Sequence, residues 1–328
     1  MEKPSNSTDI PLISVIIGTY NRCRIITDTL QSLSSQEGNI ATEIIIVDNN
    51  SRDETKKVIM SFEKKFKGRL KYVFEKRQGL SFARNTGVNQ SRGEIIAFTD
   101  DDVILSPQWL LHIKNGFINH KCCALGGKIL PVWEKTPPYW LTKELWYQLA
   151  LLDLGDECRW MKESNTGLFG ANLAVKKRIF EEGFNFDTSL GVCGKKKLLG
   201  EDIQLFFWLL DNNKKIIYDP KILVWHKISK ERLTPQYFMK WRFYAGQSFI
   251  YLKQFHKNVI NQKQTTYSRN KSKKYFYTVV KTLVVLKNYI LSILFFDSGR
   301  RFKQELRLMT LFGKCYAYLT IKFRKSLK

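Results

Sequence analysis

The sequence predicts an α/β fold in which helices flank a mostly parallel sheet. In the first hundred residues, short apolar runs alternate with longer amphipathic stretches, the order expected of strand–helix–strand units. The apolar runs are continuous and rich in β-branched residues, which is typical of parallel strands buried on both faces. The chain has 328 residues, of which 44% are hydrophobic, so it can bury a substantial core.

The pattern is regular up to about residue 100. The predicted strands are residues 12–18, 43–47, 69–74 and 94–99. Apolar residues at helical spacing follow the first strand and predict a helix with one buried face. The polar turn at 48–55 has good N-capping residues for a second helix, and 79–88 is expected to be a loop that runs into a third.

After Pro107 the pattern becomes less regular. Residues 109–117 are predicted to form a helix, and residues 124–132 a strand interrupted by two glycines and a proline. Residues 134–160 are rich in Pro, Trp and Tyr, and aromatic rings in such a loop-rich segment either stack on a sugar face or pack within the loops. The sequence leaves both interpretations open.

The last part of the predicted domain begins at an acidic pair. Glu201 and Asp202 open an apolar helix, where a carboxylate serves either as a helix cap or in a site. Two short β-like runs follow at 215–218 and 222–225, and the second ends at His226. A single histidine after a strand is either a ligand or an ordinary core or surface residue.

Polar or acidic side chains follow three of the predicted strands. Because parallel strands joined by right-handed crossovers present their carboxyl ends at one edge of the sheet, these side chains should converge. Three adjacent carboxylates repel one another unless a cation is present, and oxygen ligands suit Mg²⁺ or Mn²⁺. The alternative is a solvated acidic turn. The converging residues are Thr19, Tyr20, Asp48, Asp100, Asp101 and Asp102.

Several classes of protein are disfavoured by what the sequence lacks. It has neither of the Gly-rich phosphate loops, G-x-G-x-x-G or G-x-x-x-x-G-K-[ST], so a dinucleotide enzyme or a P-loop kinase is not expected. The six cysteines form no Cys-x-x-Cys pair, and their spacing matches no zinc site. With no secretory leader expected at the N-terminus, we predict reduced thiols in the cytoplasm.

The positive charge is concentrated in the last hundred residues. Residues 231–328 contain 21 Lys or Arg against 3 Asp or Glu, a net charge of +18 out of +24 for the whole chain. The apolar stretch 281–296 is flanked by basic residues, which predicts an amphipathic helix held in the interface of an anionic membrane. A helix buried against the rest of the protein and a segment that binds nucleic acid are the alternatives.

Seven segments, in order and at the right spacing, resemble the family 2 glycosyltransferases, which have a nucleotide-diphospho-sugar-binding GT-A fold. The resemblance covers about residues 11–230. One departure is at Asn49 and Asn50, where many relatives have a second acidic residue and a glycine. The segments are 14–22 (SVIIGTYNR), 47–51 (VDNNS), 79–87 with its Ala-Arg-Asn core, 98–102 (FTDDD), 170–172 (GAN), 200–202 (GED) and His226.

The resemblance implies roles for the residues of the donor site. Asp102 would bind a divalent cation, Mn²⁺ or Mg²⁺, with His226 as a further metal or phosphate contact, and the cation would neutralise the departing diphosphate. Asp100 would contact the ribose, with Asp101 in support. Asp48 would accept the imide N–H of uracil, and Arg84 would face the diphosphate. Thr19 and Tyr20 would complete the nucleotide-sugar site.

The resemblance also implies the reaction. Asp202, with Glu201 beside it, would be the base that deprotonates the acceptor hydroxyl, and attack opposite the diphosphate would invert the anomeric carbon. The expected substrates are a UDP-sugar and a glycan or lipid-linked acceptor in polysaccharide or cell-surface glycan synthesis. A sugar nucleotidyltransferase and a nucleic-acid-binding protein are the alternatives, and no nucleic acid is expected as a partner.

These expectations define a two-part chain. Residues 1–230 would form a GT-A catalytic domain, with the nucleotide-sugar half at about 11–105 and the acceptor half at about 106–230. Residues 231–328 would form a basic helical extension that associates with the membrane. The expected location is the cytoplasmic face of a membrane, with the protein bound peripherally.

Overall fold

The structure, a computed structural model, describes residues 12–162, 167–193, 196–253, 284–291, 293 and 298–326. The strands are β1 (Ile13–Thr19), β2 (Thr42–Asp48), β3 (Leu70–Phe74), β4 (Ile95–Phe98), β5 (Val103–Leu105), β6 (Ala124–Gly126), β7 (Ile129–Trp133), β8 (Arg159–Trp160), β9 (Leu173–Lys176), β10 (Gly191–Cys193), β11 (Lys196–Leu198), β12 (Ile216–Tyr218) and β13 (Val224–Ile228).

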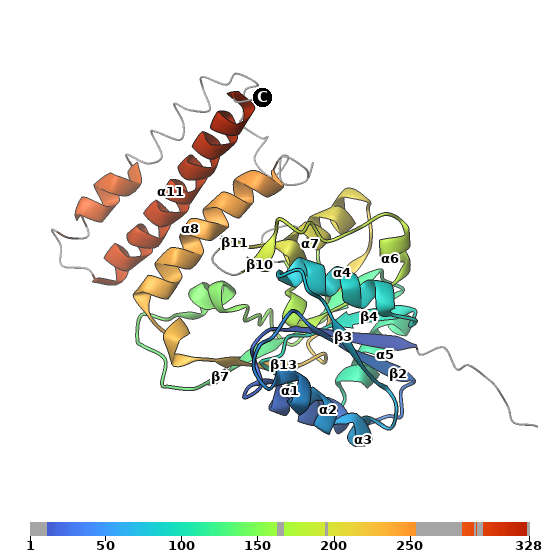
Figure 1. The fold of residues 1–328 in the computed structure, drawn as a ribbon. Helices are drawn as coiled ribbons and strands as arrows, with labels where there is room; N and C mark the ends of the chain where they lie inside the picture. Colours follow the sequence, from blue (N-terminus) through green and yellow to red (C-terminus); the bar gives the residue numbers. More distant parts are fainter. Residues whose placement is uncertain are drawn as a thin grey trace, which may run out of the picture.

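Helices alternate with these strands along the chain. The α-helices are α1 (Ile26–Ser34), α2 (Thr55–Ser61), α3 (Glu63–Phe66), α4 (Leu80–Gln90), α5 (Trp109–His120), α6 (Arg178–Glu181), α7 (Glu201–Asp211), α8 (Pro235–Leu252) and α11 (Ser298–Ser326). Short 3-10 helices are η1 (Lys143–Leu149), η2 (Gly170–Asn172) and η3 (Lys230–Arg232). In Figure 1, α1, α2 and α3 lie below the central sheet and α4 lies above it.

The central sheet has eight strands in the order β3-β2-β1-β4-β9-β6-β12-β8. Strands β1 to β4 are parallel, β9 is antiparallel to both β4 and β6, and β8 is antiparallel to β12. Every residue of β2 is buried, which agrees with its continuous apolar sequence. The predicted α/β class, with a mostly parallel sheet flanked by helices, is confirmed.

A second sheet brings a late strand next to the acidic triplet. It has three strands in the order β5-β13-β7, and β13 pairs with β5 so that His226 lies opposite Val103. The prediction that His226 follows the end of a strand is therefore wrong, because it lies within β13. The predicted single strand at 124–132 is also wrong. It divides into β6 and β7, which belong to different sheets.

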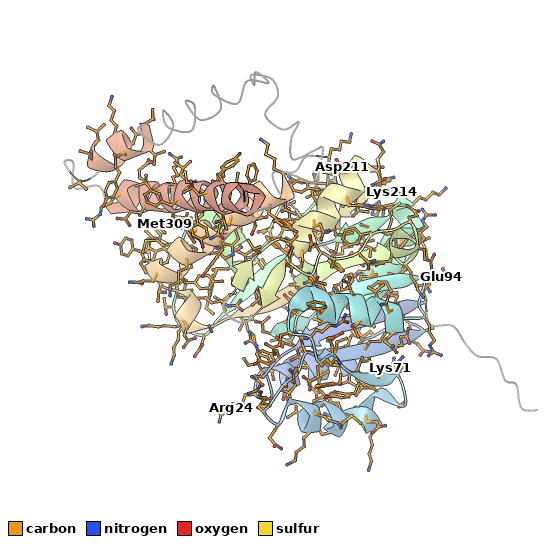
Figure 2. The ribbon with its side chains drawn as sticks, turned by 45° about the horizontal axis from the view of Figure 1, so that its top comes forward. Arg24, Lys71, Glu94, Asp211, Lys214 and Met309 are labelled. Carbon is orange, nitrogen blue, oxygen red and sulfur yellow. The ribbon has the colours of Figure 1, made fainter. Side chains whose placement is uncertain are left out.

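The two long C-terminal helices lie side by side at one end of the molecule (Figure 1). Their backbones approach closely at two glycines: a Cβ on Gly246 would lie 2.3 Å from the carbonyl oxygen of Thr310, and one on Gly313 would lie 1.9 Å from that of Phe243. Larger residues would force α8 and α11 apart. Figure 2, in which Met309 marks α11, shows this helix well away from Lys71 and Glu94.

The helix pair is also attached to the rest of the protein. The ring of Trp140 packs edge-on against Phe238 of α8 and Phe302 of α11, at centroid distances of 5.1 and 4.9 Å. Lys303 of α11 forms an ion pair with Glu144 of η1 at 2.9 Å. No helix among the described residues is long and apolar enough to cross a bilayer. The predicted interfacial segment 281–296 falls partly outside the described residues, and 284–291 within it is helical.

Candidate active site

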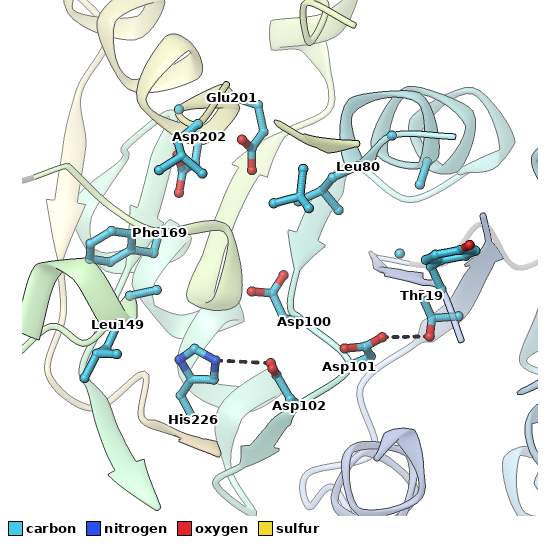
Figure 3. Close-up of a pocket in the computed structure, with 18 of the residues that line it drawn as sticks. Thr19, Leu80, Asp100, Asp101, Asp102, Leu149, Phe169, Glu201, Asp202 and His226 are labelled. Carbon is cyan, nitrogen blue, oxygen red and sulfur yellow. Dashed lines mark hydrogen bonds and ion pairs between the residues drawn. The ribbon is translucent and has the colours of Figure 1, made fainter. Parts of the chain in front are cut away.

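A cavity of about 360 Å³ lies beyond the carboxyl ends of β1 and β4. Its walls come from the loops after these strands, the beginnings of α4 and α7, and the helices η1 and α8. In Figure 3, Asp202 and Glu201 lie above Asp100 and Asp102, with Phe169 and Leu149 along one side. The cavity is therefore bounded by two separate groups of carboxylates.

The acidic triplet is held in place by hydrogen bonds from two other elements. The hydroxyl of Thr19, at the end of β1, donates to Asp101 Oδ2 at 2.7 Å. The hydroxyl of Thr29 in α1 donates to the backbone oxygen of Asp101 at 2.9 Å and accepts from the backbone N–H of Val103 at 3.2 Å. The triplet is thus a rigid turn, and the interpretation as a freely solvated acidic turn does not apply.

Asp102 has two cationic or polar partners. His226 Nε2 lies 3.2 Å from Asp102 Oδ1, and Arg232 Nη2 lies 3.2 Å from Asp102 Oδ2. Arg232 Nη1 also lies 3.1 Å from His226 Nε2, so the three side chains form a closed group. We name Asp102, His226 and Arg232 the cation-side cluster. Burial alone would raise the pKa of Asp102, but His226 and Arg232 outweigh it and hold that pKa well below its usual range.

Asp101 has the opposite electrostatic balance. Burial and the neighbouring charge of Asp102 raise the pKa of Asp101 to about 7, although Arg22 and the Thr19 hydroxyl favour its charged form. Arg22 lies 3.9 Å from Asp101. Asp100 is the most accessible of the three: a third of its side chain is exposed, and it faces the cavity.

The donor set of the cation-side cluster fits a divalent cation. Asp102 Oδ1 and His226 Nε2 are at a separation that one ion can bridge, and Mg²⁺ or Mn²⁺ is often held by few protein ligands together with water and substrate phosphates. His226 Nδ1 is buried and has no hydrogen-bond partner among the described residues, so no second residue fixes the tautomer of this ring. Arg232 contacts His226 Nε2 and the other oxygen of Asp102, Oδ2, so a cation bound between Asp102 and His226 would compete with its guanidinium.

Arg84 has partners different from those expected. Its guanidinium is buried, forms an ion pair with Glu201 at 2.9 Å and lies 3.6 Å from Asp100. Arg84 is not among the residues that line the cavity, and its guanidinium links two carboxylates. Its contact with the diphosphate stays a prediction. Gly170 makes room for the guanidinium, because a Cβ there would lie 2.0 Å from Arg84 Nη2.

Asp202 lies at the N-terminus of α7 and is held by backbone N–H groups. Gly170 donates to Oδ2 at 3.3 Å and Ile203 donates to Oδ1 at 2.8 Å. Burial and the adjacent charge of Glu201 nevertheless raise the pKa of Asp202 to about 7, against the opposing charge of Arg84. The helix terminus therefore does not keep this carboxylate acidic. We name Glu201, Asp202 and Arg84 the base-side cluster.

The remaining predicted residues lie at the carboxyl ends of β1 and β2. Tyr20 lines it and is 42% exposed, so its ring is available to a ligand. Asp48 is adjacent to Thr19 in the β1–β2 register, but it does not line the cavity and accepts hydrogen bonds from Tyr72 Oη and the backbone of Ser51. Asn50 has φ +69°, the left-handed conformation that favours glycine.

Sequence reasoning did not identify several residues of the cavity. Arg232 follows β13, and Tyr237 and Trp241 come from the start of α8, which had been assigned to the extension. None of these positions carries a motif. Tyr147 and Phe169 also line the cavity with their rings 4.9 Å apart, and only Tyr147 lies in the segment noted for its aromatic residues.

Comparison with known sequences identifies relatives of this chain. The model of Glycosyl transferase family 2 matches residues 14–184. A glucosyl-dolichyl phosphate glucuronosyltransferase of Haloferax volcanii is 23% identical over 240 residues, 72% of this chain and 75% of the relative. A GalNAc(5)-diNAcBac-PP-undecaprenol beta-1,3-glucosyltransferase of Campylobacter jejuni is 36% identical over 95 residues, which are 28% of this chain and 30% of the relative.

Solved structures share the fold at low sequence identity. The mannosyltransferase PcManGT from Pyrobaculum calidifontis, in complex with GDP-Man and Mn²⁺, aligns over 98% of this chain and 77% of its own, with a TM-score of 0.54 and 16% identity. Residues 1–349 of S. aureus TarS in complex with UDP align over 90% of both chains, with a TM-score of 0.53 and 16% identity. At this level of identity the likeness concerns the fold.

Proposed function

Because the chain belongs to glycosyl transferase family 2 and is a glycosyltransferase, we propose that it transfers a sugar from UDP to a glycan or lipid-linked acceptor with inversion. The acceptor class rests on the relatives named above, one of which acts on a dolichyl phosphate and another on an undecaprenol-linked glycan. The proposed setting is the synthesis of a polysaccharide or cell-surface glycan. Under this proposal the protein is not a sugar nucleotidyltransferase, and it does not act by binding nucleic acid.

One observation carries the proposal. The cation-side and base-side clusters face each other across one cavity, and the pKa of Asp102 is lowered while that of Asp202 is raised to about 7. A permanently charged carboxylate suits a cation, and a carboxylate with a pKa near neutrality suits proton transfer. Displacement of a diphosphate by a hydroxyl requires both: one acid that stays charged and one that can take up a proton.

The donor would lie between these clusters. Tyr20, Asn49 and the end of β1 would contact the nucleotide, with Asp48 behind them, while Asp100 would contact the ribose, with Asp101 in support. Asp102 and His226 would hold Mn²⁺ or Mg²⁺, which supplies charge neutralisation for the departing diphosphate. Arg232 would then be free to turn toward the phosphates, where a guanidinium forms bidentate hydrogen bonds.

The acceptor would enter beside Asp202. The ionised carboxylate of Asp202 accepts the proton of the attacking hydroxyl, while Glu201 remains paired with Arg84. Tyr147, Phe169 and Trp241 form an aromatic wall beside this carboxylate, and rings of this kind stack on sugar faces. Attack from the side opposite the diphosphate inverts the anomeric carbon.

We further propose that α11 lies on the membrane surface. Phe312, Tyr316 and Leu319 are more than half exposed and are spaced to share one face of α11. The extension also carries most of the net positive charge, which anionic lipid attracts. In flotation experiments the full chain should bind anionic liposomes. The variant F312S/L319S should bind these liposomes more weakly. Equal flotation of this variant at low and high salt would contradict the proposal.

Transfer assays with Mn²⁺, UDP-sugars and lipid-linked acceptors test the main proposal. Because the base must be ionised, kcat/KM should rise with pH through about 7 and level off above it, following the pKa of Asp202. Chelation should abolish activity and Mn²⁺ should restore it. A rate that is constant between pH 5 and 9, or a product that retains the anomeric configuration, would contradict the proposal.

A further inference from the structure

A second group of metal-ligating side chains lies outside the cavity, where α5, β8 and β12 meet. His120 is the last residue of α5, Cys158 directly precedes β8, and Asp219 directly follows β12. One ligand atom from each of the three lies within 4.8 Å of the other two. Among the described residues this is the one group of three or more such side chains at that spacing, and none of its members lines the cavity.

Strand pairing brings two of these residues together. Strand β8 is antiparallel to β12, with Arg159 opposite Tyr218, so the next pair in this register is Cys158 and Asp219. This pairing places the thiol of Cys158 beside the carboxylate of Asp219, with the ligand atoms within 4.8 Å of each other. The proximity of Cys158 and Asp219 therefore follows from the pairing of β8 with β12.

Asp219 is fixed and presents one oxygen to the group. Its backbone N–H donates to the Gly126 oxygen at 2.9 Å, and its Oδ1 accepts from the N–H of Lys221 at 3.0 Å. The other oxygen, Oδ2, lies 3.9 Å from His120 Nε2. The side chain of Asp219 is 9% exposed and that of His120 is 28% exposed, so the group is open to solvent mainly on the side of Cys158.

The surroundings favour a cation at this point. His120 ends a helix of 12 residues, and the carbonyl groups at a helix C-terminus carry partial negative charge. A bound metal would deprotonate the Cys158 thiol by its own charge.

We propose that His120, Cys158 and Asp219 bind a Zn²⁺ ion, with water as the fourth ligand. In a tetrahedral zinc site the ligand atoms lie about 3.3–3.8 Å apart, so the present separations need only small side-chain rotations. Thiolate and imidazole ligands select Zn²⁺ over Mg²⁺ and Mn²⁺, which prefer oxygen. The site is thus chemically distinct from the cation-side cluster.

The ion would tie the segment before β8 to the sheet. This segment follows η1, which contributes Tyr147 and Leu149 to the cavity wall. Other contacts already anchor it, since Lys128 pairs with Asp156 at 2.6 Å and Tyr218 Oη accepts from the N–H of Leu154 at 3.2 Å. The zinc site would stabilise the wall of the cavity without touching the substrates.

Titration of the full chain with Co²⁺, followed by absorption spectroscopy, tests the proposal. We expect one Co²⁺ per chain with a thiolate-to-cobalt charge-transfer band, and Zn²⁺ should displace it. Cys158→Ser should remove the band and His120→Ala should weaken binding at least about tenfold, a loss of about 1.4 kcal/mol. Cys315→Ser is the matched control, because Cys315 is also exposed but lies on α11.

Two further measurements separate this site from the proposed active site. Asp102→Asn should leave the charge-transfer band unchanged, and excess Mn²⁺ should not displace the Co²⁺. Zn²⁺ should raise the unfolding midpoint of the wild type but not that of Cys158→Ser. Absence of the band, or its persistence in Cys158→Ser, would overturn the proposal, and neither result depends on whether the protein transfers a sugar.

Discussion

The two clusters that face each other across the cavity each contain an aspartate and an arginine, yet the pKa values of the two aspartates are shifted in opposite directions. Both contain one arginine and at least one aspartate that is largely buried, and burial alone raises the pKa of both Asp102 and Asp202. In the cation-side cluster Arg232 and His226 contact Asp102 itself. In the base-side cluster Arg84 contacts Glu201, and Asp202 lies beside that pair.

The difference shows that the position of the arginine decides the chemistry of the neighbouring acid. An arginine bonded directly to a carboxylate keeps it ionised and suited to a cation. When the arginine pairs with the adjacent carboxylate instead, the second acid has no cation of its own. Burial and repulsion from the neighbouring charge then raise its pKa, so that it can hold a proton near neutral pH. Asp101 behaves like Asp202 in this respect: Arg232 lies 3.2 Å from Asp102, whereas Arg22 lies 3.9 Å from Asp101.

The largest expected effect comes from removing the base. Asp202→Asn keeps the shape of the side chain and, with its one amide oxygen, one of the two backbone hydrogen bonds. It cannot accept a proton, so kcat should fall about 10²–10⁴-fold. UDP-sugar affinity, measured by calorimetry, should stay within about twofold, since the cation-side cluster is intact. A parallel loss of affinity and rate would instead assign Asp202 a structural role.

The buried arginine of the base-side cluster should matter most for stability. Arg84→Met leaves Glu201 and Asp100 without their cation, and breaking a buried pair in this way costs about 3–5 kcal/mol of unfolding free energy. Arg92→Met is the control, because Arg92 is 67% exposed and its pair with Glu43 should be worth about 1 kcal/mol or less. Denaturant unfolding of both variants gives the comparison, and equal losses would contradict it.

Asp102→Asn tests the other cluster. It removes the carboxylate that both His226 and Arg232 contact, so the gain in UDP affinity that Mn²⁺ gives the wild type should disappear. We expect a loss of at least about tenfold in Mn²⁺ and little change in chelator, where no cation is bound in either protein. Calorimetry with UDP in Mn²⁺ and in chelator measures both affinities. An equal loss of UDP affinity in the two conditions would show that Asp102 acts without a cation.

The smallest effect concerns Arg232. Because its guanidinium lies on both Asp102 and His226, Arg232→Met should make Mn²⁺ bind several-fold more tightly to the protein without donor. Lys230→Met, two residues away, is the control for the loss of a positive charge in the same region. Weaker Mn²⁺ binding in Arg232→Met would mean that the arginine and the cation do not compete.

Much of the first half of the fold could be predicted because its signals are local. The four strand predictions before residue 100 agree with β1 to β4 to within about two residues. The parallel order of those strands predicted that Thr19 lies beside the acidic triplet, and Thr19 is hydrogen-bonded to Asp101. Asp48 lies next to Thr19 but does not line the cavity. The location of the proposed base at the start of α7 also followed from its helix signal.

Other features depended on contacts between distant segments. Strand β13 places His226 beside Asp102 because it pairs with β5, and the sequence of β13 does not reveal its partner. The sequence predicts that Arg84 faces a diphosphate. In the structure its guanidinium packs against Gly170, which has no side chain to exclude it, and pairs with Glu201. The group of His120, Cys158 and Asp219 has no motif spacing, because its ligands come from three separate elements.

The sequence by itself determined the fold class, the edge of the sheet that carries the site, and the uneven distribution of charge. These follow from periodicity and composition, which act over a few residues at a time. Only the tertiary structure decided which carboxylate receives each arginine, and therefore which acid is charged and which can hold a proton. Pairing energies depend on distances of a few ångströms between side chains that are far apart in the chain, and that proximity exists only once the strands and helices have packed.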